Sequence, residues 1–282
     1  MVPDERSQPG WLARALTEAE FDSIAPVYDE TRRAIDDETL RGLSGMLLAH
    51  NCWSLLEIGV GTGRVSLPLS KEGVMTSGVD VSRKMLERAR SKGVLDVVQA
   101  DGGSTPFRGR SFDAVLLAHV FHIIENSEGV LMEGARLSRV GVFALVRKRD
   151  DNRAFPTFPG EGGVGADVEE RREWFRKLAE KYNWAWDRRR PRDWGRERRL
   201  LESYPPDELV QVSDLVDTST FEDRIERINK RAYPFTSGMP EGMKEEVVAE
   251  MRKRAAQMPA QGPRHIIHQV AFWRTETLLH RR

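Results

Sequence analysis

A short run of glycines beside an acid is the stretch of this chain whose residue types and spacing best suit chemistry. Residues 55–64 read Leu-Leu-Glu-Ile-Gly-Val-Gly-Thr-Gly-Arg, so that Glu57 precedes the alternate glycines Gly59, Gly61 and Gly63. Glycine is used where the backbone turns through positive φ or approaches a ligand closely. The apolar residues before the run predict a buried strand. The residues after it predict a helix, whose first N–H groups and positive dipole end face a ligand.

The spacing of the glycines separates two kinds of nucleotide loop. A dinucleotide fingerprint, G-x-G-x-x-G, requires glycine at position 64, where this chain has Arg64. The pattern is instead E-x-G-x-G-x-G. A pyrophosphate cradle and a nicotinamide-dependent oxidoreductase are therefore disfavoured, and the final segment, which suits an added antiparallel strand, points the same way.

Two further acids follow the next predicted strands. Asp80 ends a strand at 75–80, and Asp101 with Gly102 follows a strand at 95–100. Open α/β sheets bind ligands at the carboxyl ends of their strands, so these residues and the glycine loop are expected at one edge. An ionised carboxylate accepts two hydrogen bonds, as a ribose diol requires. Each acid alone is equally typical of a helix cap or a turn, but their order along the chain favours a ligand site.

In order and spacing, these features resemble class I S-adenosylmethionine-dependent methyltransferases over residues 21–147, most of all a small-molecule-type subgroup with a helical cap. The resemblance implies S-adenosylmethionine as methyl donor and S-adenosylhomocysteine as product. It implies that Asp80 accepts both ribose hydroxyls, that Met85 packs on the adenine and that Asp101 accepts from the adenine amino group. Glu57 would support the glycine loop near the methionine part. The cofactor-binding residues predicted in this way are Tyr28, Arg33, Glu57, Gly59, Gly61, Gly63, Asp80, Val81, Met85, Asp101, Gly102 and Ala118.

The carboxylate of the methionine part also needs partners. Residues 21–33 resemble the N-terminal cap helix of small-molecule and quinone-type methyltransferases, and Tyr28, Arg32 and Arg33 are the candidates there. A charged helix surface is the alternative for the two arginines.

Two histidines follow the fourth predicted strand, in Ala118-His119-Val120-Phe121-His122. Methyl transfer is an in-line displacement, so alignment of the reactants supplies up to about 7–11 kcal/mol without a nucleophilic residue. A general base adds about 10²–10⁴-fold when the acceptor is a hydroxyl or a protonated amine, and histidine titrates near neutral pH. His119, nearer the strand end, is predicted as the catalytic base and His122 as a substrate contact. Contacts to the cofactor or to the core are the alternative.

A distinctive loop lies in the predicted cap. Residues 231–240 read Arg-Ala-Tyr-Pro-Phe-Thr-Ser-Gly-Met-Pro, which resembles a subgroup of class I methyltransferases without an assigned substrate. Tyr233 and Phe235 are predicted to line the acceptor pocket. Hinge packing between cap and core is the equal alternative.

The alternation of apolar runs and helical segments predicts an α/β core with a cap. Strands are expected near residues 54–58, 75–80, 95–100, 112–117, 141–147, 208–216 and 264–274, and helices near 36–49, 64–72, 83–92, 127–139, 167–200, 220–231 and 241–257. The resemblance implies a Rossmann-like, mostly parallel seven-stranded sheet whose last strand is antiparallel. The predicted units are N-terminal cap helices (1–50), the cofactor-binding core (51–149), a helical insertion or substrate cap with a strand near 208–216 (150–262), and the final strand with a tail (263–282).

The composition excludes several classes of protein. The 282 residues carry 44 basic and 44 acidic side chains, so no overall field recruits nucleic acid or an anionic membrane. The one cysteine, Cys52, excludes an internal disulfide and suits a reducing compartment. The first residues lack an apolar signal-peptide core and no stretch approaches about 18 apolar residues, which predicts a cytoplasmic protein. No C-x-x-C or H-E-x-x-H spacing indicates a metal, and His265 and His268 are expected on opposite faces of a strand.

Two other functions stay open beside methylation of a small molecule. Residues 187–199 hold seven arginines with Trp184, Trp186 and Trp194 nearby, and such a pattern can hold phosphates and stack bases, as in an RNA methyltransferase. Neighbouring acids, the zero net charge and the lack of an appended RNA-binding module favour a solvated face with ion pairs. The second alternative is a module that binds the cofactor without catalysis, as a sensor or scaffold.

Overall fold

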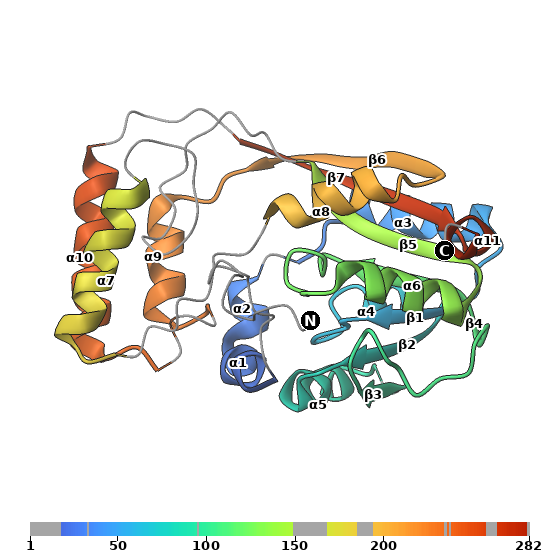
Figure 1. Cartoon of the computed structure of the whole chain (residues 1–282), viewed down its shortest axis with the longest axis horizontal. Coiled ribbons are helices and arrows are strands. Elements are labelled where there is room, and N and C mark those ends of the chain that lie inside the picture. Colours follow the sequence, from blue (N-terminus) through green and yellow to red (C-terminus); the bar gives the residue numbers. More distant parts are fainter. Residues whose placement is uncertain are drawn as a thin grey trace, which may run out of the picture.

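The computed structural model describes residues 18–32, 34–94, 96–148, 168–184, 194–233, 236, 238–257 and 264–280, which fold around a seven-stranded sheet (Figure 1). In order across the sheet, the strands are β3 (Val97–Gln99), β2 (Met75–Asp80), β1 (Ser54–Ile58), β4 (Phe112–Ala118), β5 (Ser138–Lys148), β7 (Arg264–Arg274) and β6 (Glu208–Asp217). The strands from β3 to β5 pair in parallel, whereas β7 is antiparallel to both β5 and β6. The predicted fold class, strand number and antiparallel last strand are confirmed.

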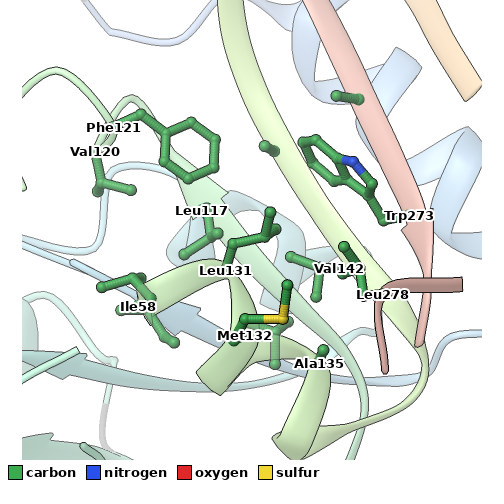
Figure 2. Packing of buried hydrophobic residues seen from close by; sticks show 14 of the residues in the cluster. Ile58, Leu117, Val120, Phe121, Leu131, Met132, Ala135, Val142, Trp273 and Leu278 are labelled. Carbon is green, nitrogen blue, oxygen red and sulfur yellow. The ribbon is translucent and has the colours of Figure 1, made fainter. Parts of the chain in front are cut away.

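Both faces of the sheet are apolar because helices cover both. The covering helices are α3 (Asp37–Ala49), α4 (Ser66–Lys71), α5 (Arg83–Ser91), α6 (Ser127–Leu137), α8 (Trp194–Ser203) and α11 (Thr275–Leu279). On one face, Leu117 and Val142 pack with Leu131 of α6 and Leu278 of α11, as Figure 2 shows. Leu116, the neighbour of Leu117, points to the other face and packs with α3 and α4. This alternation along the strands fixes the register of the core.

Several element boundaries differ by one to three residues from those expected, and one expected helix is divided. Helix α6 ends at Leu137, because Ser138 already pairs with Phe112 as the first residue of β5. The helical stretch expected over 167–200 is divided into α7 (Val168–Lys181) and α8, since Asn183 takes a left-handed φ of 46° just beyond α7. None of the helices among the described residues is long and apolar enough to cross a membrane.

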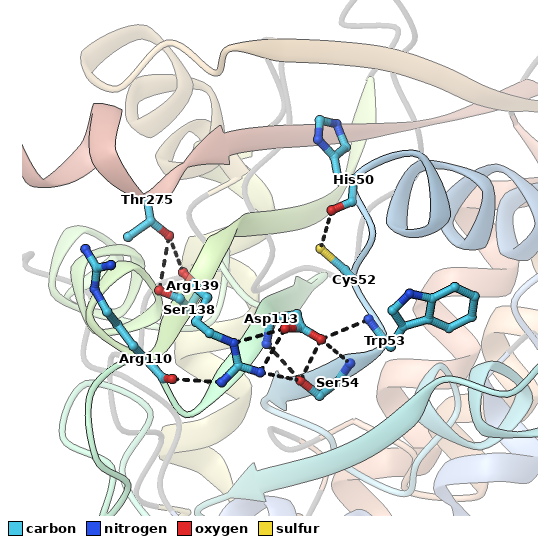
Figure 3. Close-up of polar contacts among 9 residues, drawn as sticks. All are labelled: His50, Cys52, Trp53, Ser54, Arg110, Asp113, Ser138, Arg139 and Thr275. Atoms are coloured by element: carbon cyan, nitrogen blue, oxygen red, sulfur yellow. Dashed lines mark hydrogen bonds and ion pairs between the residues drawn. The ribbon is translucent and has the colours of Figure 1, made fainter.

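A polar network closes the amino-terminal edge of the sheet (Figure 3). One carboxylate oxygen of Asp113 accepts hydrogen bonds from the backbone N–H groups of Trp53 (3.1 Å) and Ser54 (2.9 Å) and from the Ser54 hydroxyl. The other oxygen accepts from Nε (3.0 Å) and Nη2 (2.8 Å) of Arg139. These bonds join the starts of β1, β4 and β5, at the edge opposite the carboxyl ends of the strands.

A helical cap stands apart from the sheet, beyond the short N-terminal helices (Figure 1). It comprises α7, α9 (Phe221–Asn229) and α10 (Glu241–Ala256), and it has its own core around Phe175, Ile225 and Met243. The N-terminal segment consists of α1 (Glu18–Ile24), η2 (Ala25–Val27) and α2 (Tyr28–Thr31). Its residues Phe21 and Tyr28 pack beside Met85 of α5. The N-terminal helices therefore lie between the cap and the cofactor-binding edge of the sheet.

Candidate cofactor and acceptor site

A cavity of about 260 Å³ lies at the carboxyl ends of β1 to β4. The predicted site residues that line it are Tyr28, Glu57, Gly59, Gly61, Asp80, Val81, Met85, Asp101, Gly102, Ala118 and His119. Because neighbouring strands lie about 4.8 Å apart, the sheet order arranges these residues in a row. Asp101 follows β3, Asp80 ends β2, the glycine loop follows β1 and His119 follows β4.

Two positions of the loop require glycine, and each packs closely against a different side chain. Gly59 has a φ of 78°, and a Cβ there would stand 2.6 Å from Cγ1 of Val120. Gly63 also has a φ of 78°, but a Cβ there would meet Cγ2 of Val94 at 2.6 Å. Gly63 is not among the residues that line the cavity. Gly63 thus packs closely against the segment after α5, whereas the sequence predicts that it contacts the cofactor.

Asp80 holds the loop and the next helix together. One carboxylate oxygen accepts from the backbone N–H of Gly61 (2.8 Å), and the other accepts from the N–H of Ser82 (2.8 Å). Ser82 in turn caps α5 by accepting from the N–H of Met85, as the sequence predicts. Burial raises the pKa of Asp80 despite these bonds. The carboxylate is thus fixed in place at the cavity wall.

Glu57 is a buried acid at the floor of the cavity. One of its oxygens accepts from the backbone N–H of Ser66 (3.0 Å) and from the Ser66 hydroxyl. Burial raises the pKa of Glu57 to about 7, outweighing the hydrogen bonds from Ser66. A cation placed beside Glu57 would therefore favour its charged form.

The N-terminal helices are attached to the cavity rim by two acids that the sequence reasoning missed. Asp29 accepts from the hydroxyl of Thr62 in the glycine loop (2.5 Å) and from Nζ of Lys92 (3.0 Å). Asp22 accepts from the hydroxyl of Ser82 (2.6 Å) and the N–H of Lys84 (3.1 Å). An acid in a polar helix gives no signal of its partner when that partner lies 33 or 60 residues away. The resemblance of residues 21–33 to a cap helix was the available pointer.

Arg32 connects the N-terminal segment to the cap. Its guanidinium carbon lies 5.2 Å from the ring centre of Tyr28 and 5.4 Å from that of Tyr233, and it donates to the carbonyl of Ala232 (3.2 Å). Neither Arg32 nor Tyr233 lines the cavity. The geometry favours the hinge-packing alternative for Tyr233, while Arg33 and Phe235 lie outside the described residues.

His119 closes the row at the end of β4. Its backbone has a φ of 56°, unusual for a residue with a Cβ, and its N–H bonds to the carbonyl of Leu145 on β5 (3.1 Å). Its Nε2 is inaccessible to solvent and has no hydrogen-bond partner among the described residues. Burial lowers the pKa of His119 well below its ordinary value, and the charge of Arg147 lowers it further. His122 does not line the cavity, although its charge contributes to the same lowering.

Residues 56–146 match the family model described as a methyltransferase domain. This stretch is a methyltransferase domain. The match covers the glycine loop, Asp80, Asp101, His119 and His122, and it ends within β5. The domain thus contains every cavity-lining residue except those of the N-terminal segment and Ile35.

Curated relatives of the methyltransferase domain come from several bacteria. A demethylmenaquinone methyltransferase of Tropheryma whipplei is 29% identical over 48% of this chain and 59% of its own length. A 27-O-demethylrifamycin SV methyltransferase of Amycolatopsis mediterranei is 30% identical over 52% of this chain and 56% of its own length. The chain thus spans less than two thirds of these relatives. Among solved structures, an S-adenosylmethionine-dependent methyltransferase from Thermotoga maritima is 18% identical, with a TM-score of 0.49 over 90% of this chain and 98% of that one.

The cavity is also lined by residues that sequence reasoning did not assign. They are mostly apolar, apart from Thr62 and Arg64: Phe21, Ile35, Ile58, Val60, Thr62, Arg64, Val65, Val79, Ala100, Val120, Ile123, Ile124 and Val130. Arg64 had served only to exclude a dinucleotide loop. Apolar side chains carry no signal that separates a cavity wall from the core, so only the fold could place them. Among the described residues, no three His, Cys, Asp or Glu side chains gather in an arrangement that would hold a metal ion.

Proposed function

We propose that this protein transfers a methyl group from S-adenosylmethionine to a small organic acceptor by in-line displacement. The observation that carries the proposal is the row of polar groups along the cavity, which follows the order of the parts of the donor. Asp101 would meet the adenine, Asp80 the ribose and Glu57 the methionine ammonium. The position of His119 on the next strand leaves it beyond the donor, on the acceptor side.

The residues of the cavity fit S-adenosylmethionine on three counts. The glycine loop lines the cavity with bare backbone at Gly59 and Gly61, and a Cβ on Gly61 would enter open space. Asp80 presents a fixed carboxylate with its two backbone bonds already made. Glu57 offers a carboxylate whose charge a bound ammonium would favour.

His119 is the residue we assign to the acceptor. S-adenosylmethionine supplies an electrophilic methyl group on a sulfonium, which leaves as a neutral thioether. As the acceptor's oxygen or nitrogen bonds to carbon, the proton it loses would pass to Nε2 of His119 and then to solvent. The low pKa of His119 makes it a weak base, which suffices because a hydroxyl that is being methylated becomes strongly acidic. Nε2 has no other hydrogen-bond partner among the described residues, which supports this assignment.

The apolar part of the cavity wall supports an organic acceptor. Ile35, Ile123 and Ile124 are apolar, and Phe21 and Tyr28 cover the cavity from the N-terminal segment. The relatives named for demethylmenaquinone and demethylrifamycin support an organic small molecule of this kind.

In the arginine-rich stretch 187–199, Arg196 lies in the part that the structure describes. It donates to the carbonyl of Ile124 and so attaches α8 to the core.

Calorimetry with S-adenosylhomocysteine tests the donor site. We expect wild type to bind, and Asp80→Asn to bind about 10-fold to 100-fold more weakly, because it loses a charge-assisted hydrogen bond worth about 1.5–3 kcal/mol. Asn keeps one acceptor for the backbone, so thermal unfolding can establish that the variant is folded. Glu87→Ala, an exposed acid on the neighbouring helix, is the control and should bind as wild type does. Wild-type affinity in folded Asp80→Asn would place the donor elsewhere.

A turnover measurement separates an enzyme from a cofactor-binding sensor. Protein with S-adenosylmethionine and a small-molecule extract should accumulate S-adenosylhomocysteine faster than protein with S-adenosylmethionine alone. Equal rates across extracts, in a protein that binds the donor, would favour a sensor. Faster turnover with bulk tRNA than with small-molecule extracts would favour RNA as the acceptor.

A further inference from the structure

Behind His119 lies a buried polar chain that the donor site does not use. His268 on β7 is paired in the sheet with Arg147 on β5, and its ring centre lies 5.5 Å from that of His119. Nε of Arg147 donates to Nε2 of His268 (3.2 Å). His268 is buried, whereas His265 is exposed and pairs with Asp214, so their predicted opposite orientation is confirmed.

The hydrogen bond from Arg147 determines the tautomer of His268. A guanidinium only donates, so Nε2 of His268 must accept. Burial lowers the pKa of His268 to about 4, with a further contribution from Arg147, so the ring is neutral at pH 7 and its proton sits on Nδ1. That nitrogen lies 3.1 Å from the hydroxyl oxygens of both Thr39 and Ser213.

The chain continues from the two hydroxyls to a carboxylate. Ser213 and Thr39 are joined at 2.7 Å, and the Thr39 hydroxyl lies 2.6 Å from Oδ2 of Asp36. Donation from His268 to Ser213, from Ser213 to Thr39 and from Thr39 to Asp36 leaves each group with a partner. A completely satisfied buried network is rigid. It therefore fixes His268, and with it the guanidinium of Arg147.

The position of this chain gives it an effect on the acceptor side of the site. We propose that Arg147 and His268 are positioning residues that hold a guanidinium behind the imidazole of His119, so that its Nε2 remains open to the proton of the acceptor. The inference rests on the proposed methyl transfer. Burial lowers the pKa of His119 most, and the charges that lower it further are those of Arg147 from β5, His268 from β7, His122 from the loop after β4 and Arg64 from the end of the glycine loop. All four oppose a positive charge on His119.

NMR titration of the histidine side chains, labelled with ¹³C at Cε1, tests the proposal in the full-length protein. The His119 signal is assigned by its absence in His119→Gln. In wild type it should remain that of a neutral ring at pH values where free histidine is already protonated. Arg147→Gln should raise the titration midpoint of His119 by about one pH unit or more, and Arg147→Lys should keep it low. Arg252→Gln removes one positive charge from exposed α10 and should leave the midpoint unchanged.

The chain behind Arg147 has its own test. His268→Gln can still accept from Arg147 and donate to Ser213, so it should hold the His119 midpoint low, whereas His268→Leu should raise it. If His268→Leu does not fold, the Arg147 variants alone decide. A His119 that titrates like free histidine in wild type, or that has the same midpoint in wild type and Arg147→Gln, would overturn the proposal.

A separate measurement keeps this proposal distinct from the donor site. Affinity for S-adenosylhomocysteine should change less than about twofold in Arg147→Gln, because Arg147 does not line the cavity. If wild type failed to bind S-adenosylhomocysteine while His119 titrated as expected, the proposed function would fail and the role of Arg147 would stand.

Discussion

At the scale of single residues, Glu57 shows how a site can oppose stability. Its carboxyl group is buried and accepts hydrogen bonds from Ser66. Burial nevertheless raises its pKa to about 7. In the unfolded chain the same group ionises near pH 4.5. Between these values the folded protein binds more protons than the unfolded chain, so stability falls as pH rises from about 4.5 to 7. A further cation placed beside the carboxylate would favour its charged form.

This balance predicts opposite effects of one substitution. Glu57→Gln should raise the free energy of unfolding of the ligand-free protein at pH 8 by about 1–3 kcal/mol, measured by urea denaturation. It should also weaken S-adenosylhomocysteine binding and remove the rise in affinity that we expect in wild type between pH 5.5 and 7. A variant that is less stable than wild type at pH 8 and keeps the pH dependence of binding would contradict this role.

At the scale of elements, the N-terminal helices form a cover that is held by polar contacts at its two ends. Asp22 on α1 binds the start of α5, and Asp29 on α2 binds the glycine loop through Thr62. Phe21 and Tyr28, each of which precedes one of these acids in the chain, line the cavity. The sequence of this segment could describe a helix with acids, but the pairing with Thr62 depends on how the chain returns over the sheet.

Loosening one of these contacts should weaken donor binding through the cover. We expect Asp29→Ala to lower the affinity for S-adenosylhomocysteine about 3-fold to 10-fold, because the variant must order α2 on binding. Hydrogen exchange of residues 21–31 should become faster in the ligand-free variant. Glu30→Ala, on the exposed side of the same helix, is the matched control. Unchanged exchange and affinity in Asp29→Ala would remove the cover from the binding site.

At the scale of the whole molecule, the two edges of the sheet carry different tasks. The carboxyl ends of β1 to β4 hold the cavity, whereas the amino-terminal edge is closed by Asp113 and Arg139. Burial acts to raise the pKa of Asp113, but the hydrogen bonds of Arg139 and Ser54 outweigh it and lower the pKa to about 2. Its contribution to stability is therefore present above about pH 4 and is lost as pH falls toward 2.

Substitution at this edge should affect folding and leave the site intact. Asp113→Ala should lower the free energy of unfolding at pH 7 by about 1–3 kcal/mol, because it leaves the N–H groups of Trp53 and Ser54 and the Arg139 side chain without their acceptor. Asp113→Asn should cost less. S-adenosylhomocysteine affinity of the folded variants, measured by calorimetry, should match wild type. A large loss of affinity without a loss of stability would show that the two edges are coupled.

The sequence by itself determined the sheet and the donor side of the cavity. Alternation of apolar runs with helices placed each of the seven strands among the described residues, and Glu57, Asp80 and Asp101 were found because acids at or near the carboxyl ends of strands are visible in a local window. Tertiary structure alone decided which groups lie behind His119. Asp36, Thr39, Ser213, His268 and Arg147 come from distant segments, with Thr39 and His268 229 residues apart, and they meet only because β7 inserts between β5 and β6. Contacts of that kind follow from strand pairing across the sheet, for which no short stretch of sequence carries a signal.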